Sequence, residues 1–167
     1  MGIIYDYFIA TSDEDAAQII DWGAGPGHPP EGRPAKEHVE GGIDPAVQLG
    51  TLEAILAERP YEEVIDRPRH ANLIAPDEES DTEQWVVTVS DDFVTLMADA
   101  SDDQFAAAAG PWSETEEFRG AADPHDLEQI MRGLREIARR AREQRGHMYC
   151  WMSLFTGPGS AWQCAWA

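Results

Sequence analysis

The stretch Asp123–Phe155, DPHDLEQIMRGLREIARRAREQRGHMYCWMSLF, decides the fold, because it predicts a long helix followed by a buried strand. Asp123 can accept hydrogen bonds from the free N–H groups of the first turn, and Pro124 suits the first helical position. Apolar residues then recur every three or four positions, as on one face of a helix. They are Leu127, Ile130, Met131, Leu134, Ile137, Ala138 and Ala141. Arginines fill the last turns and Gly146 is expected to adopt a left-handed cap, so the helix is predicted over 124–145.

The strand predicted at His147–Phe155 is apolar on both faces. Met148 and Cys150 lie on one face, whereas Tyr149 and Trp151 lie on the other. A strand of this kind belongs in the middle of a sheet that is covered on both sides.

The rest of the chain predicts layers packed around this unit. Strands are expected at 3–10 and 85–89, and Asp66–Thr82 is expected to be a polar connector. Helix starts are expected at Thr11 or Ser12, at Asp44-Pro45, at Ser90 and at Ser101, and Gly110-Pro111 is expected to end the last of these helices. Tyr61–Ile65 is expected to add a turn or two. We therefore predict a single α/β (α+β) domain over 1–167, in which about five helices pack on a small sheet.

The charge excludes several classes of partner. Thirty-two acidic residues face twelve Lys and Arg, which gives a net charge of −20. Free nucleic acid and an anionic membrane both require clustered cations, so neither is expected as a partner. A basic protein is the partner that the charge favours. The same acidity, with Lys36 as the only lysine, is typical of a GC-rich, salt-adapted bacterial genome, and the composition favours that interpretation over a binding signal.

The chain start and the cysteines predict a cytoplasmic protein. Met1–Asp6 lacks the basic start of a signal peptide and has an acid inside its apolar run. No apolar stretch approaches the length that spans a membrane. Two cysteines, Cys150 and Cys164, in a chain of this length indicate a reducing compartment.

Two polar segments raise the question of a binding loop. The stretch Gly23–Pro34 is rich in Gly and Pro but lacks the Lys and Ser/Thr of a phosphate-binding loop, so a mobile surface loop is the favoured interpretation. Four acids between Asp77 and Asp81 lack the spacing and glycine of an EF-hand, which favours a solvated loop over a calcium site. The tail 156–167, which contains Trp162 and Trp166, is expected to fold back on the core.

No motif of catalysis, metal binding or cofactor binding is recognisable. His147 and Cys150 would point to opposite faces of a strand, which argues against a shared metal, and Cys150 is expected to fill the core. We therefore predict no catalytic residue, no metal ligand and no cofactor. The arginines of the C-terminal helix are expected to interact favourably with the negative end of its dipole. They are also expected to form ion pairs with acidic residues of the same helix and of other elements, with Glu136–Arg140 as one pair.

The order of predicted elements resembles that of the YfbM-like family of uncharacterised bacterial proteins. The similar stretches are Met1–Ile3, Leu49–Arg59, Val89–Val94, Leu134–Ala141 and Gly146–Trp151. The loop 23–34 and the Trp-containing tail depart from that pattern. The resemblance implies a compact α/β domain and no established activity, so it assigns no catalytic residue.

Two functions follow as hypotheses. The first is an acidic protein-interaction module, such as an inhibitor or immunity-like protein, because the charge is high and no chemical motif is present. The second is a small enzyme or ligand binder with a pocket beside the aromatic strands. Its candidate residues are Tyr5, Asp6, Tyr7, Trp112, Tyr149 and Trp151. Asp6 could be an acid with a raised pKa, but a hydrogen-bonded or edge-strand Asp is the favoured interpretation.

Overall fold

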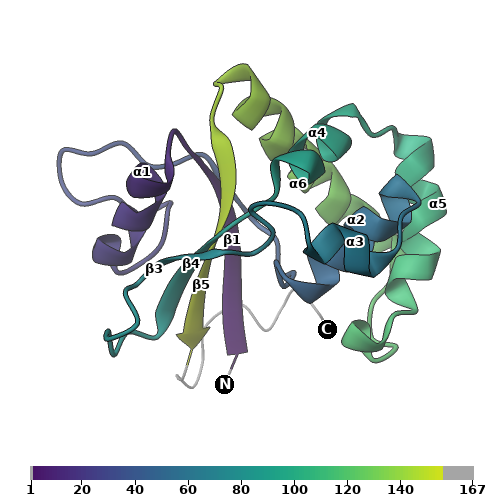
Figure 1. The fold of residues 1–167 in the computed structure, drawn as a ribbon, viewed down its shortest axis with the longest axis horizontal. Helices are drawn as coiled ribbons and strands as arrows, with labels where there is room; N and C mark the ends of the chain where they lie inside the picture. The colour runs from purple at the N-terminus through teal and green to yellow at the C-terminus, as the bar shows by residue number, and fades with distance from the viewer. Residues whose placement is uncertain (1, 156–167) are drawn as a thin grey trace.

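The computed structural model describes residues 2–155, and within them a five-stranded sheet lies between two unequal helical layers (Figure 1). The strand order is β2-β1-β5-β4-β3, and every neighbouring pair is antiparallel. The strands are β1 (Gly2–Ala10), β2 (His38–Glu40), β3 (Leu73–Ala75), β4 (Gln84–Thr88) and β5 (His147–Phe155). The predicted mixed α/β fold is confirmed.

The central strand is β5, as its two apolar faces predicted. It pairs with β1 over nine residues, from Gly2 opposite Phe155 to Ala10 opposite His147, and with β4 on its other side. Both edge strands were missed by the sequence analysis, which expected Asp66–Thr82 to be a connector without a strand. That expectation was wrong at Leu73–Ala75, because three residues are too few to show a periodic pattern.

The helices cover the two faces of the sheet unevenly (Figure 1). On one face lie α1 (Asp13–Ala17) and the 3-10 turn η1 (Gln18–Trp22), which pack on Phe8 and Tyr149. The other face carries a larger core under four of the remaining helices. The remaining helical elements are α2 (Val47–Ala57), α3 (Tyr61–Ile65), α4 (Asp91–Asp99), α5 (Asp102–Ser113), η2 (Glu116–Phe118) and α6 (Pro124–Glu143).

The helix starts predicted at Ser12, Ser90, Ser101 and Asp123 are confirmed by their caps. The start expected at Asp44-Pro45 was wrong by two residues, because α2 begins at Val47 and its N-cap is Ala46, although the Asp44 carboxylate accepts from the N–H of Val47. The Ser12 hydroxyl accepts from the N–H of Asp15, the Ser90 hydroxyl accepts from Phe93, and Ser101 forms a capping box with Gln104. The Asp123 carboxylate likewise accepts from the N–H of His125 at 2.8 Å. These contacts satisfy donors that the first turn of a helix leaves free.

The helix α5 runs further than its sequence predicted. Gly110-Pro111 was expected to end it, but the helix continues to Ser113 with Pro111 inside. The reason is Trp112, which is fully buried, donates from Nε1 to the Gln48 carbonyl at 3.0 Å and packs edge-on against Phe118. Burying so large a ring outweighs the hydrogen bond that a proline removes from a helix.

The helix α6 forms ion pairs both within itself and with other elements, as expected, but the predicted pair Glu136–Arg140 was wrong. Arg140 was expected to pair with Glu136, and instead it pairs with Glu37 at 3.5 Å, while Arg139 takes Glu136. Pairs across elements are present, such as Arg142 with Asp99 at 2.8 Å. Arg139 and Arg135 also donate to the carbonyl groups of Ala98 and Ala100. They thereby satisfy carbonyl groups at the C-terminal end of α4.

Gly146 does not provide the left-handed cap that was expected of it. The left-handed residue is Arg145, with φ of 55°. Gly146 instead allows the chain to pass close to β1, because a Cβ at this position would lie 2.9 Å from the carbonyl oxygen of Ala10 and 3.0 Å from a methyl group of Ile9. The glycine is required by close approach and not by backbone conformation.

We expect Gly146→Ala to lower the free energy of unfolding by about 1–3 kcal/mol, because the new methyl group meets a backbone atom that cannot move alone. Urea denaturation followed by circular dichroism measures this change. Gly133→Ala in α6 is the matched control. There the new Cβ meets only a methyl group of Val39 at 3.2 Å, and alanine favours the helix by about 1 kcal/mol. Equal stability of the two variants would show that the close approach is unimportant.

Cys150 is fully buried in the larger core, which confirms that it acts as a small apolar residue there. Cys164, Trp162, Trp166 and the predicted tail 156–167 lie outside the described residues.

Candidate functional site

The six candidate residues of the sheet do not converge on one site. Because successive side chains along a strand point to opposite faces of the sheet, the candidate residues of β1 and β5 are divided between the two faces. Tyr5, Tyr7 and Trp112 lie on the side of α6, whereas Asp6, Tyr149 and Trp151 lie on the side of α1. Tyr7, Trp112 and Tyr149 are fully buried. The Tyr7 hydroxyl donates to the Ile43 carbonyl at 2.7 Å, as a core tyrosine does.

Asp6 has an unusual environment for a carboxylate. It is only 8% exposed, it lies in an interior strand, and its Oδ1 has no hydrogen-bond partner within residues 2–155. The expectation of a hydrogen-bonded or edge-strand aspartate was therefore wrong for this oxygen. Burial and the nearby charge of Glu40 raise the pKa of Asp6 to about 6, against the opposing influence of His38 and His28. A buried charge without a partner is costly, so ionisation is disfavoured here.

The loop 23–34 lies over the same part of the sheet. A Cβ at Gly25 would lie 2.9 Å from the ring of Trp151, which is the residue opposite Asp6 in the β1–β5 register. A Cβ at Gly27 would likewise lie 2.6 Å from the ring of His38. The side chain of Gln84 joins Trp151 to the loop, because it accepts from Trp151 Nε1 and donates to the Gly23 carbonyl. These glycines let the loop backbone lie close to the rings of Trp151 and His38, and Trp151 is the residue paired with Asp6 in the sheet.

A polar network that the sequence analysis did not find lies where β1 ends and β5 begins. The Tyr149 hydroxyl donates to Asp13 Oδ1 at 2.7 Å, and Arg69 donates to the same oxygen at 2.9 Å. Arg69 also approaches Asp91, which lies 2.8 Å from His147 Nδ1. Burial opposes ionisation of Asp13, but the bonds from Tyr149 and Arg69 outweigh it and lower the pKa of Asp13. The network binds α1 and α4 to the sheet.

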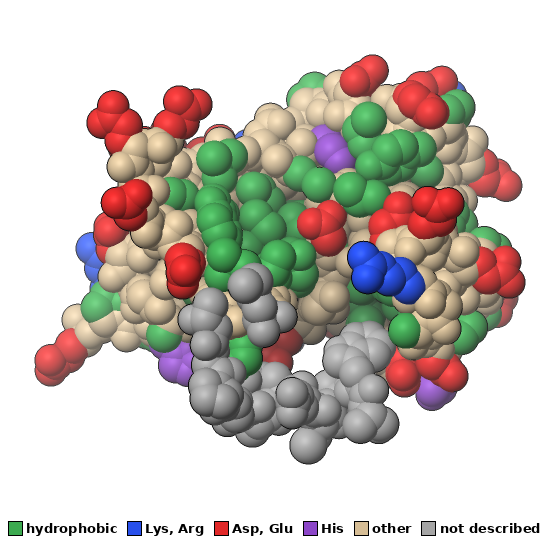
Figure 2. All heavy atoms as spheres, turned by 90° about the horizontal axis from the view of Figure 1, so that it is seen from below, with side chains coloured by type: hydrophobic (Ala, Val, Ile, Leu, Met, Phe, Trp, Pro, Cys, Tyr) green, Lys and Arg blue, Asp and Glu red, His purple; other side chains and the backbone are tan. Residues whose placement is uncertain are grey.

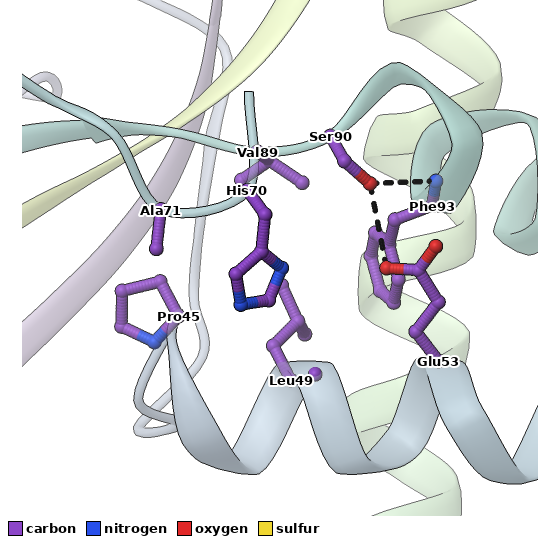
Figure 3. Close-up of a pocket in the computed structure, with 9 residues that line it drawn as sticks. Pro45, Leu49, Glu53, His70, Ala71, Val89, Ser90 and Phe93 are labelled. Carbon is purple, nitrogen blue, oxygen red and sulfur yellow. Dashed lines mark hydrogen bonds between the residues drawn. The ribbon is translucent and has the colours of Figure 1, made fainter. Parts of the chain in front are cut away.

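A narrow pocket separates α2 from the start of α4 (Figure 3). The Ser90 hydroxyl donates to Glu53 at 3.3 Å and accepts from the N–H of Phe93 at 3.1 Å. His70 Nε2 lies 3.0 Å from the carbonyl oxygen of Ala46. The histidine is therefore engaged away from the serine, and the pocket has no room for a water-sized molecule. A serine, a histidine and a carboxylate lie near one another here without the contacts of a catalytic triad.

Glu53 is the most deeply buried acid of this region. It is 2% exposed and forms an ion pair with Arg67. Burial raises the pKa of Glu53, although the charge and hydrogen bond of Arg67 act in the opposite direction. Arg67 is 24% exposed and also lies 3.6 Å from Asp92, so its guanidinium reaches from the closed pocket to the surface.

On the outer side of Arg67, the surface opens into a groove. The groove has a volume of about 360 Å³ and lies between the C-terminal end of α2, the outer face of α4 and the start of α5. Its apolar lining comes from Ala57, Leu96 and Ala100, and its charged lining from Arg67, Asp92 and Asp99. This groove could not be predicted from the sequence, because four separate segments of the chain have to come together to form it. We call it the α2–α4 groove.

The ionised groups of the surface are unevenly matched. Within residues 2–155, nine of the twelve Lys and Arg side chains lie within 4.0 Å of a carboxylate oxygen, but only eleven of the thirty-two carboxylates lie that close to a Lys or Arg. Figure 2 shows many carboxylates and few cations on the face seen from the end where β1 begins. The surface field is therefore strongly negative.

The described residues contain no group of three or more His, Cys, Asp or Glu side chains that could hold a metal ion. Among the helices of that same part of the chain, none is both long and apolar enough to cross a membrane. Comparison with protein-family models, with curated proteins and with solved structures gives no match. The resemblance to the YfbM-like family thus stays a prediction, and function has to be inferred from the geometry.

Proposed function

We propose that this chain is a protein-interaction module that presents an acidic surface to a basic protein, in the manner of an inhibitor or immunity protein. The observation that supports this most directly is the excess of unmatched carboxylates, because most of the few cations are already engaged within the molecule. A field of one sign speeds the encounter with an oppositely charged protein and weakens as salt is added.

The arrangement of the aromatic residues gives less support to a ligand binder at the sheet. Tyr7, Tyr149 and Trp112 are fully buried and belong to two different faces. Their polar atoms bond to Ile43, Asp13 and Gln48, which leaves these rings as parts of the core. An open surface region with charge complementarity to a protein is the better-supported candidate.

Affinity capture from a lysate of the source cells tests the proposal. The immobilised chain is expected to retain one or a few basic proteins at about 0.15 M ionic strength, and more of the same proteins at about 0.01 M. Retention should fall as salt rises, because the association is electrostatic.

A column of polyglutamate with the same total charge is the control for non-specific attraction. The proposed partner is expected on the protein column and not on the polymer column, because shape complementarity has to add to charge. Recovery of no protein at either ionic strength would contradict the proposal, and so would recovery of the same set from both columns. Either result would favour acidity as a general property of the proteome.

A further inference from the structure

We infer that the α2–α4 groove accepts an arginine side chain of the basic partner. This inference rests on the proposed function and names the contact through which that function would be exerted. The occupant would lay its aliphatic stem along Leu96 and place its guanidinium beside Asp99 and the C-terminal end of α2.

The spacing along α4 gives the groove its shape. Asp92, Leu96 and Asp99 are separated by four and three positions, so they form one row on the outer face of the helix. Leu96 is half-buried, whereas both aspartates are 64% exposed. The row therefore has an apolar centre between two carboxylates. This pattern suits a side chain with an apolar stem and a cationic head, as arginine and lysine have.

The two aspartates are not equivalent. Asp92 lies 3.6 Å from the guanidinium of Arg67, which already supplies a positive charge at that end of the groove. At the other end, Arg142 donates to Oδ1 of Asp99 at 2.8 Å, and Oδ2 has no hydrogen-bond partner within residues 2–155. A carboxylate can accept several hydrogen bonds at once, so Asp99 can take a second cation.

The end of α2 adds to the negative potential at this point. The last turn of α2 contains no basic residue, and Glu58 follows as its C-cap with φ of 52°. The carbonyl groups of a helix C-terminus carry a partial negative charge that favours a cation. Ala57, the last residue of α2, lines the groove. The last residue of α2, Asp99 and the apolar residues Leu96 and Ala100 thus line the same groove.

Arginine fits this arrangement better than lysine does. The guanidinium is planar, weakly hydrated and able to donate to a carboxylate and to carbonyl oxygens at the same time. It can also lie flat against apolar side chains such as Leu96 and Ala57. Arginine is moreover enriched in the centres of protein interfaces, whereas lysine is depleted.

The test uses N-acetyl-arginine amide as the probe and N-acetyl-citrulline amide, which has the same shape without the charge, as its control. Two-dimensional NMR spectra of the full chain are recorded during each titration. Saturable shifts are expected at Ala57, Leu96 and Ala100 with the arginine compound and not with the citrulline compound. Shifts that spread over all acidic surfaces without saturating would overturn the inference.

Two variants locate the contact. Asp99→Asn replaces an exposed residue, so the chain should fold normally, and binding of the probe is expected to weaken by about two- to fivefold. Leu96→Arg places a guanidinium of the protein's own in the groove, and the shifts are expected to disappear. Unchanged binding in the folded Asp99→Asn variant would contradict the assignment.

The same variants separate this inference from the proposed function. A partner that is captured equally well by the original chain and by Asp99→Asn would refute the role of the groove and leave the interaction module intact. Capture of no partner would refute the proposed function, and the titration would still show whether the groove accepts a guanidinium.

Discussion

Replacing Arg67 by methionine is expected to lower the free energy of unfolding by about 3–5 kcal/mol at neutral pH, because it leaves a buried carboxylate without its cation. Glu53 is only 2% exposed, and its remaining hydrogen bond is the one from Ser90. Methionine keeps much of the volume of the arginine stem, so the loss should come from the charge. Urea unfolding at pH 7 measures the change.

The loss of stability caused by Arg67→Met should be smaller at acidic pH. Burial places the pKa of Glu53 above its ordinary value in the folded protein, and removal of Arg67, which lowers it, should raise it further. The folded state then holds its proton more tightly than the unfolded state does, so stability falls as the pH rises from the ordinary value through the raised one. An equal loss at pH 4 and pH 7 would show that packing and not charge is responsible.

The double variant Glu53→Gln, Arg67→Met is the matched control for the charge. It removes both ionised groups and keeps their approximate volume, so we expect it to recover much of the stability lost by Arg67→Met alone. A double variant as unstable as the single one would contradict the explanation.

Asp6→Asn is expected to stabilise the protein by about 1–3 kcal/mol above pH 7 and to have little effect near pH 4. The pKa of Asp6 in the folded chain, about 6, lies above its ordinary value, so the folded state binds the proton more tightly. The contribution of Asp6 to the stability of the wild type is therefore expected to fall as the pH rises from about 4 to about 6, and asparagine at this position cannot ionise. Urea unfolding across this range measures the difference.

The control for net charge is Asp81→Asn, which removes one negative charge from an exposed loop. Its stability should follow the wild-type pH profile. If Asp6→Asn is instead less stable than the wild type at every pH, the carboxylate makes favourable contacts, for example with His38, and the account of Asp6 as an unpartnered charge is wrong.

Those parts of the fold that depend on local sequence could be predicted. The caps at Ser90, Ser101 and Asp123 and the single apolar face of α6 depend on contacts within a few residues of chain, and each is present where it was expected. The two apolar faces of β5 also predicted its central position, because burial on both sides requires neighbours on both sides.

Features set by distant partners could not be predicted. The helix α5 passes through Pro111 because Trp112 reaches Gln48, which is far away in the sequence. The strands β2 and β3 have three residues each, and they are strands because they pair with β1 and with β4. Local propensity contains no information on either contact.

The candidate site was predicted only as a kind of surface. The count of charges predicted an acidic surface, and a basic partner for that surface stays a prediction. The aromatic residues chosen from β1 and β5 alternate between two faces and form no common site. The α2–α4 groove depends on the meeting of Ala57, Arg67, Leu96 and Asp99, which come from three parts of the chain. Their conjunction follows from the tertiary fold and from no pattern in the sequence.

The place of β5 between β1 and β4 has a consequence for synthesis on the ribosome. Until residues 147–155 have emerged, the nascent chain has β1 with β2 and β4 with β3, and no strand to join the two pairs. Isolated two-stranded units are marginally stable in water, so the sheet can assemble only when its last strand enters the middle. The apolar faces of the nascent chain stay exposed until then, and chaperones have this interval in which to bind.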